Sequence, residues 1–229
     1  MSDSPVVILI SANTEWRVVL DERRPEIVET IPFGEVFRQE IAGFQSIFVH
    51  GGWGKIAAAG STQYTIDRWQ PKLLINLGTC GGFAGQVDNG DIILAESTLV
   101  YDIVEQMNNP QDAIDHYATT LDLSWLGSPL PLPVRRDRLI SADRDIIAAE
   151  VPELIKTYQA IAADWESGAI AWVAARNQIR CLILRGVSDQ VGVDGGEAYN
   201  QPAVFISGTQ MVMRQLLDSL PGWLRICGL

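Results

Sequence analysis

The fold is decided by the stretch Leu73-Leu74-Ile75-Asn76-Leu77-Gly78-Thr79-Cys80-Gly81-Gly82-Phe83, which is followed by Gly90-Asp91-Ile92-Ile93-Leu94. The first pattern predicts a buried strand, Leu73 to Leu77, that ends in a turn rich in glycine and small residues before another strand begins. Enzymes of the α/β class use such strand ends to present backbone N–H groups and small hydroxyls to ligands. We therefore expect Asn76 to Gly82 to form one wall of a ligand site.

Other apolar runs predict further strands that are buried on both faces. These runs are Val6 to Ser11, Ile47 to Val49, Ile92 to Ala95 and Cys181 to Leu184. Helical patterns lie at Ile56 to Trp69, Ala169 to Arg176 and Val204 to Leu217, and an amphipathic segment near Asp145 to Ala162 is broken by Pro152. Strands that alternate with helices predict an α/β fold, with three α/β/α layers and a mixed, mostly parallel, twisted central sheet.

The segment from Asn108 to Asp137 has a different composition, because it is rich in proline and polar residues. It predicts long surface loops, and loops of this length in a compact domain are often functional. The chain has 229 residues and shows no internal repeat or change in composition that marks a boundary. We therefore expect a single domain over residues 1–229.

The net charge of the chain limits the kinds of molecule that it is expected to bind. A formal net charge of −11 argues against nucleic acid or an anionic membrane surface, and leaves a small molecule as the expected ligand. The three cysteines, Cys80, Cys181 and Cys227, have no metal-site spacing and indicate free thiols in a reducing compartment. Met1 to Pro5 lacks the basic region of a signal peptide, and no apolar stretch reaches the ~20 residues of a membrane span. A cytoplasmic protein without a metal is the expectation.

Three acidic residues lie where predicted elements meet: Glu15 after the first strand, Glu166 before a helix, and Asp189 after an apolar run. Carboxylates at strand ends converge on one crevice, where their pKa values are pushed apart and one acts as acid while another acts as base. Each also has an ordinary structural explanation. Glu15 and Glu166 fit the N-terminal turn of a helix, and Ser188-Asp189 fits a cap or a turn.

Four segments, in the same order and with similar spacing, resemble the purine nucleoside phosphorylase/nucleosidase superfamily. Within it, the chain is most similar to the methylthioadenosine/S-adenosylhomocysteine nucleosidases. The segments are Gly52 to Ala59, Asn76 to Gly82 with Gly90-Asp91-Ile92, Trp165-Glu166 with Ala169-Ile170-Ala171, and Arg185 to Asp189. The resemblance covers nearly the whole chain. It implies a phosphorylase/hydrolase-like fold, a homodimer, no cofactor, and cleavage of the N-glycosidic bond of a purine nucleoside.

The resemblance also implies roles for individual residues. Asp189 would be the general acid that protonates the purine at N7, and Glu15 would activate the attacking water, which Thr79 and Arg185 help to place. Glu166 would bind the ribose hydroxyls, where its attraction grows as the sugar becomes cationic. The predicted catalytic residues are therefore Asp189, Glu15 and Arg185. The predicted substrate-binding residues are Thr79, Cys80, Gly81, Ile146, Trp165, Glu166 and Ser188.

The nucleophile is expected to be water rather than phosphate. Phosphorylases of this superfamily bind phosphate through arginines in the first loop and before the Gly-Thr/Ser turn. This chain has no arginine in Leu74 to Leu77, and its first loop carries Glu15. Two alternatives remain: a phosphorylase that recruits Arg17 or Arg185, and a purine-binding protein without catalytic activity.

The chain departs from the family pattern at several positions. Glu15 is three residues after Ala12, whereas the catalytic glutamate of the family is four residues after the alanine. Asp145 stands where an aromatic residue usually stacks on the purine, and Trp165 replaces a methionine under the ribose. The loop near Val104 to Pro110, which would contribute to the 5′ side of the site, has no match. The exact nucleoside and its 5′ substituent therefore stay open.

Overall fold

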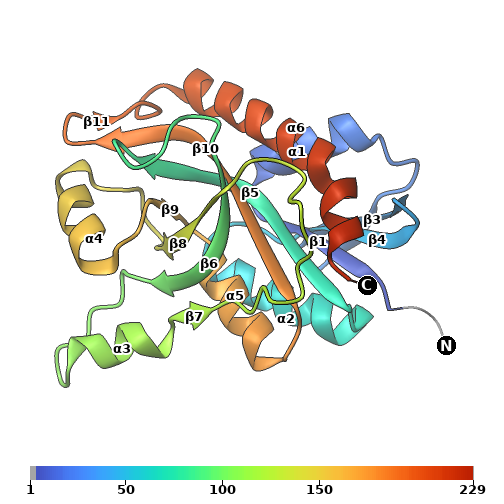
Figure 1. Cartoon of the computed structure of the whole chain (residues 1–229), viewed down its shortest axis with the longest axis horizontal. Coiled ribbons are helices and arrows are strands. Elements are labelled where there is room, and N and C mark those ends of the chain that lie inside the picture. The colour runs from blue at the N-terminus through green and yellow to red at the C-terminus, as the bar shows by residue number, and fades with distance from the viewer. Residues whose placement is uncertain (1–3, 229) are drawn as a thin grey trace.

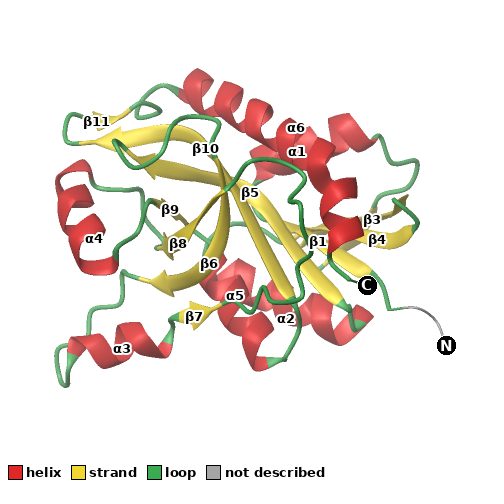
Figure 2. Ribbon diagram, viewed as in Figure 1, coloured by secondary structure: helices red, strands yellow, loops and turns green. Residues whose placement is uncertain are grey.

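A mixed eleven-stranded sheet runs through the computed structural model, which describes residues 4–228, and helices cover both faces of the sheet (Figures 1 and 2). The strands are β1 (Val6–Ile10), β2 (Glu29–Ile31), β3 (Gly34–Ile41), β4 (Phe44–His50), β5 (Leu73–Phe83), β6 (Ile92–Val100), β7 (Thr119–Thr120), β8 (Arg135–Ser141), β9 (Ala162–Asp164), β10 (Cys181–Gly192) and β11 (Gly195–Gly196). The helices are α1 (Asn13–Arg23), α2 (Lys55–Trp69), α3 (Pro110–His116), the 3₁₀ turn η1 (Ala148–Glu150), α4 (Val151–Tyr158), α5 (Ser167–Arg176) and α6 (Pro202–Ile226). Met1 to Asp3, on which the expectation about a signal peptide partly rests, lie outside the described residues.

The sheet mixes parallel and antiparallel pairings: β9 is antiparallel to β5 near the middle, and the pairings at both edges are also antiparallel. The strand order is β11-β10-β6-β8-β9-β5-β1-β4-β3-β2, with β7 paired to β6 outside this path. The pairings of β1 with β4 and β5, of β5 with β10, and of β8 with β6 and β9 are parallel. Strand β10 pairs with both β6 and β5, so the strands from β5 through β9, β8 and β6 to β10 close into a ring. The predicted mixed α/β architecture is confirmed, and the closure is a feature that strand patterns along the chain do not reveal.

Two hydrophobic cores lie on opposite faces of the sheet. In β1, Val6, Ile8 and Ile10 belong to the core under α1 and α6, whereas Val7 and Leu9 belong to the core under α2 and α5. Figure 2 shows these two helix layers on either side of the strands. Because successive side chains of a strand point to opposite faces, a strand between two cores must be apolar at every position. This explains the unbroken apolar run of β1.

The predicted turn from Asn76 to Gly82 is wrong, because β5 continues without interruption to Phe83. Its second half pairs with β10 on one side and with β9 on the other. The glycines permit close approach instead of a turn. A Cβ on Gly78 would lie 2.9 Å from Oε1 of Glu15, and a Cβ on Gly82 would lie 2.7 Å from Cγ1 of Val187. Glycine within a strand often marks such a close approach.

Several other predicted boundaries also change. Pro152 does not break a helix but lies in the first turn of α4, where its missing N–H is tolerated. Strand β10 extends to Gly192, and α6 extends to Ile226. The predicted loop region contains α3, whose start is capped by the Asn109 side chain and followed by Pro110. In the part of the chain that is described, no helix is both long and apolar enough to cross a membrane.

The packing of α6 on β10 leads to a test of stability. A Cβ on Gly208 would lie 2.2 Å from the carbonyl oxygen of Ser188, which is backbone and cannot rotate away. Overpacking of this kind typically costs about 1–3 kcal/mol. We therefore expect Gly208→Ala to lower the free energy of unfolding by about that amount in urea denaturation. Ser207→Ala, at the exposed neighbouring position, is the control and should change stability by less than about 0.5 kcal/mol. Equal stability of the two variants would contradict the close approach.

Candidate active site

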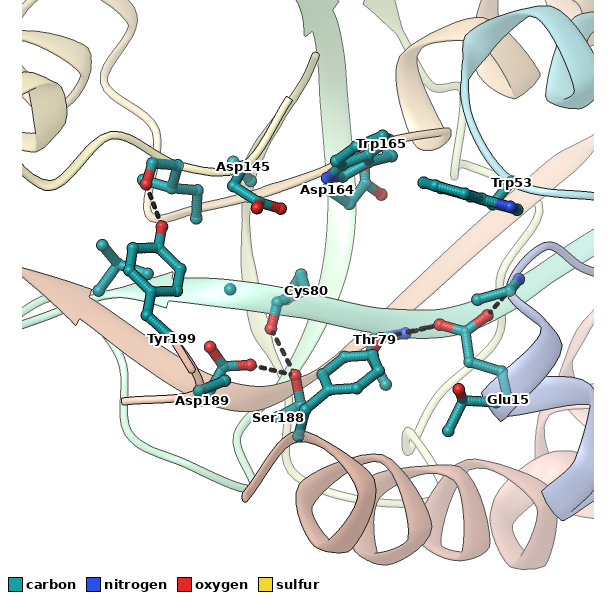
Figure 3. Close-up of a pocket in the computed structure, with 18 of the residues that line it drawn as sticks. Glu15, Trp53, Thr79, Cys80, Asp145, Asp164, Trp165, Ser188, Asp189 and Tyr199 are labelled. Carbon is teal, nitrogen blue, oxygen red and sulfur yellow. Dashed lines mark hydrogen bonds between the residues drawn. The ribbon is translucent and has the colours of Figure 1, made fainter. Parts of the chain in front are cut away.

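A cavity of about 600 Å³ lies where β1, β8 and β9 end, beside the second halves of β5 and β10 (Figure 3). Nine of the ten predicted site residues line it. They are Glu15, Thr79, Cys80, Gly81, Ile146, Trp165, Glu166, Ser188 and Asp189. The sequence analysis did not select Trp53, Asp164, Tyr199 and Phe205, which also line the cavity. Residues from distant parts of the chain thus meet in one pocket, as the family resemblance implies.

Glu15 lies in the first turn of α1 and is 4% exposed. One carboxylate oxygen accepts a hydrogen bond from the N–H of Ala12 (3.1 Å). The other oxygen accepts from the N–H (2.6 Å) and the hydroxyl (2.8 Å) of Thr79. The side chain therefore caps the helix and faces the cavity at once, so its ordinary structural explanation and its functional one are both compatible with the geometry.

Asp189 lies within β10, at a bulge where the register with β5 shifts between Val187 and Asp189. Adjacent side chains of a regular strand point to opposite faces, and the bulge allows both Ser188 and Asp189 to line the cavity. The Ser188 hydroxyl donates to the Asp189 carboxylate (2.6 Å). Burial raises the pKa of Asp189, and the nearby charges of Glu197 and Asp145 add to the rise, whereas the Ser188 hydrogen bond opposes it. Such a carboxyl group is suited to donate a proton.

Glu166 stands at the N-terminus of α5 and accepts a hydrogen bond from the N–H of Gly54 (3.0 Å). The residue is 8% exposed. Burial, followed by the negative charges of Asp164 and Glu15, raises the pKa of Glu166 to about 8. This carboxyl group therefore keeps its proton near neutral pH. A positive charge beside it would favour the ionised form.

Arg185 is the one predicted site residue that does not line the cavity. It is 1% exposed and lies beneath the cavity, where its Nε donates to Asp164 (2.7 Å) and its Nη2 donates to Asn76 (2.7 Å). Burial disfavours its charge, but the surrounding carboxylates outweigh burial and raise the pKa of Arg185. The guanidinium is therefore a fixed positive charge under the carboxylates, and its donors are directed to protein atoms.

Aromatic side chains border the two ends of the cavity. Trp53 and Trp165 lie against each other, with ring centroids 5.0 Å apart, at the end away from Asp189 (Figure 3). Tyr199 lies at the Asp189 end, and its hydroxyl donates to the carbonyl oxygen of Ile146. The signal for Trp53 was present in the sequence, because it is a large apolar residue between glycines in a segment that matches the family.

The arrangement can supply a proton at one end and hold hydroxyl groups or water at the other. Asp189 is suited to donate a proton, and the carboxyl groups of Glu15 and Glu166 line the same cavity. Within residues 4–228, no group of three or more His, Cys, Asp or Glu side chains is placed to hold a metal ion. The carboxyl groups that line the cavity can supply acid–base and electrostatic chemistry.

A family model described as the phosphorylase superfamily matches residues 7–219. The chain is 22% identical over 211 residues to the 5′-methylthioadenosine/S-adenosylhomocysteine nucleosidase of Bacillus thuringiensis (strain Al Hakam), and the match covers 86% of this chain and 90% of the relative.

Two solved structures show the same fold. One is the 5′-methylthioadenosine/S-adenosylhomocysteine nucleosidase of Neisseria meningitidis in complex with methylthio-immucillin-A, with a TM-score of 0.76 and 20% identity. The other is the corresponding enzyme of S. pneumoniae with the transition-state inhibitor MT-ImmA, with a TM-score of 0.78 and 18% identity. Each match covers 97% of this chain and 99% of the solved chain. The predicted phosphorylase/hydrolase-like α/β/α fold is confirmed.

The raised pKa of Glu166 makes stability depend on pH. The unfolded chain loses this proton as the pH rises through the ordinary value of 4.5, whereas the folded protein keeps it up to about 8. The contribution of Glu166 to stability therefore declines between these two values as the pH rises. We expect Glu166→Gln to remove this decline. Urea denaturation from pH 4.5 to 8 should show the variant becoming more stable relative to the wild type as the pH increases.

Glu26→Gln is the control for this experiment, because Glu26 is exposed. Its free energy of unfolding should follow the wild type across the whole pH range. A Glu166→Gln profile that runs parallel to the wild-type profile would show that the folded protein does not hold the proton.

Proposed function

The chain belongs to the phosphorylase superfamily, and on this basis we propose that it is a nucleosidase that hydrolyses the N-glycosidic bond of a purine nucleoside. The products are the free base and the sugar. The proposed substrate is an adenine-type nucleoside similar to 5′-methylthioadenosine or S-adenosylhomocysteine. Both compounds appear in the names of the similar proteins described above. The observation that carries the proposal is that Asp189, whose pKa is raised by burial, lines one cavity together with Glu15 and Glu166.

Asp189 acts as the general acid. Its carboxyl proton passes to N7 of the purine, and the electron pair of the C1′–N9 bond stays with the base as that bond breaks. The Ser188 hydroxyl donates to the resulting carboxylate and holds its orientation. A purine that carries this proton is a better leaving group, because it departs as a neutral molecule.

Glu166 binds the 2′- and 3′-hydroxyls of the ribose. The sugar becomes positively charged as the bond breaks, so the attraction of an ionised Glu166 is greater in the transition state than in the bound substrate. The hydrogen bond from Gly54 holds this carboxylate in place at the end of β9. Trp165, the residue before Glu166, provides an apolar surface beside the sugar.

Glu15 orients the attacking water and accepts its proton. The Thr79 hydroxyl donates to Glu15, so the oxygen of Thr79 is left as an acceptor for the water. Arg185 acts through its charge beneath these groups, because its donors are directed to Asp164 and Asn76.

Phosphate is the less favoured nucleophile. Arg17 is exposed and is not among the residues that line the cavity, and Arg144, which does line it, donates to Glu150. A phosphate beside the sugar would instead meet the carboxylate of Glu15 and the carboxyl group of Glu166, neither of which supplies a positive charge. Repulsion between like charges opposes its binding. A purine-binding protein without activity is disfavoured because the acid and the water-binding groups are both present.

The active form that we propose is a cytoplasmic homodimer. Four large apolar side chains, from the segment that enters α2 and from the loop after β6, are highly exposed: Trp53 (60%), Ile56 (88%), Val104 (79%) and Met107 (88%). The ammonium of Lys55, the first residue of α2, forms an ion pair with Asp102, which joins the start of α2 to that loop. Exposed apolar surface of this kind is typical of a protein–protein contact, and sedimentation of the purified chain measures the number of subunits.

The first test of function measures release of free base. The protein should release adenine from 5′-methylthioadenosine or adenosine in buffer without phosphate, and added phosphate should not increase the rate. Chromatography of the products distinguishes free sugar from sugar phosphate. A strict requirement for phosphate would make the protein a phosphorylase, and tight binding without base release would make it a binding protein.

A second test concerns the general acid. Asp189→Asn keeps the shape of the side chain but has no proton to give, so kcat/KM for adenosine should fall roughly 10²- to 10⁴-fold. With 7-methyladenosine, whose base is already cationic and leaves as a neutral molecule, the loss should be less than about tenfold. Circular dichroism and thermal unfolding verify that the variant is folded. A folded variant that cleaves adenosine at the wild-type rate would contradict the role of Asp189.

A further inference from the structure

Asp145 is a carboxylate that faces the cavity without a partner of its own. It lies in the loop between β8 and η1 and points into the cavity, across from Asp189 (Figure 3). Among residues 4–228, no side chain or backbone group forms a hydrogen bond or an ion pair with it. Its position is nevertheless defined, because the Tyr199 hydroxyl donates to the carbonyl oxygen of the next residue, Ile146.

The positive charges around the cavity are all directed elsewhere. Arg144, the residue before Asp145, donates twice to Glu150 (3.1 and 2.6 Å), and its guanidinium lies 5.1 Å from the centre of the Tyr101 ring. Lys55 forms an ion pair with Asp102, and Arg185 forms one with Asp164. The negative charge of Asp145 is therefore not neutralised within this part of the protein.

The effect of this charge reaches the other groups at the same end of the cavity. Burial raises the pKa of Tyr199 to about 12, and the negative charges of Asp145 and Asp189 add to the rise. Burial also raises the pKa of Asp189, with contributions from Glu197 and Asp145. This end of the cavity is thus a region of negative potential, and a cationic ligand group would be attracted to it.

We infer that Asp145 is a specificity-determining residue of the base-binding end, which favours purines that carry a positive charge. This inference rests on the proposed function, which places the base beside Asp189. The purine acquires its positive charge in one of two ways. Either Asp189 transfers its proton to N7 of a neutral purine, or the purine already carries an N7-methyl group. The face of a neutral aromatic ring is electron-rich and gains nothing from a nearby carboxylate, whereas a purinium cation is attracted to it.

The two kinds of substrate should respond differently to the loss of this charge. For a neutral purine the positive charge exists only after the proton has moved, so Asp145 stabilises the transition state and acts on kcat. For an N7-methylated purine the charge is present before binding, so Asp145 stabilises the bound substrate and acts on KM. If the loop that carries Asp145 only stacked on the base or only supported the fold, its variants would not change kcat for one substrate and KM for the other.

The experiment compares adenosine with 7-methyladenosine in the wild type, Asp145→Asn and Asp145→Glu. For Asp145→Asn we expect kcat on adenosine to fall roughly tenfold with KM changed less than about threefold, and KM for 7-methyladenosine to rise roughly tenfold with a similar kcat. Asp145→Glu retains the charge and should restore most of both properties. Asp218→Asn, which removes an exposed carboxylate of α6 outside the cavity lining, is the matched control and should behave as the wild type.

The outcomes separate this inference from the proposed function. If the wild type cleaves both nucleosides and Asp145→Asn behaves like Asp218→Asn, the role of Asp145 is wrong and the nucleosidase assignment stands. If Asp145→Asn and Asp145→Glu lose activity equally, the charge is not the cause and the inference is again wrong. If the wild type releases base from neither nucleoside, the proposed function fails and the inference fails with it.

Discussion

The buried ion pair between Arg185 and Asp164 is the interaction on which the rest of the cavity depends. It joins β10 to the end of β9, and both side chains are almost completely enclosed. Arg185 also donates to Asn76 of β5, whose amide donates to the carbonyl oxygen of Leu9 in β1 (2.9 Å). Four strands are thus held together by one chain of polar contacts. Removal of one partner would leave a buried charge alone, which typically costs about 3–5 kcal/mol. The same guanidinium provides the positive charge that allows Glu15 and Glu166 to lie close together.

Close approach of the backbone is the second condition for this arrangement. A Cβ on Gly78 would lie 3.1 Å from Nη1 of Arg185 and 2.9 Å from Oε1 of Glu15. A Cβ on Gly81 would lie 2.6 Å from the side chain of Ile146. Gly78 therefore leaves room for the side chains of Arg185 and Glu15 against β5, and Gly81 leaves room for Ile146. This is why the stretch that resembles a flexible turn in the sequence is a rigid, buried strand in the structure.

The sequence predicts which segments form strands and which residues line the cavity better than it predicts where each strand ends. Periodicity identified β1 correctly, since an apolar residue at every position requires a core on both faces. The same local pattern could not reveal that β5 extends through Gly82, because that extension depends on pairing with β10, which is about a hundred residues away. Trp53 and Tyr199 were missed for a related reason. Their loops are held at the cavity by contacts between distant parts of the chain, such as those of Gly54 with Glu166 and of Tyr199 with Ile146, and these contacts leave no local pattern.

Helix geometry explains how Glu15 reaches the cavity although it is only three residues after Ala12. Successive residues of an α-helix are turned by about 100°, so Glu15 and Trp16 cannot face the same side of α1. The structure directs Trp16 toward the sheet, where its ring stacks on His50 and its N–H donates to Glu35 (2.6 Å). Glu15 then faces Thr79 and also accepts a hydrogen bond from the N–H of Ala12, the residue at the N-cap, whose own side chain has no acceptor. A glutamate three residues after Ala12 thereby reaches the cavity, and the tryptophan that follows it fixes the rotation of the helix.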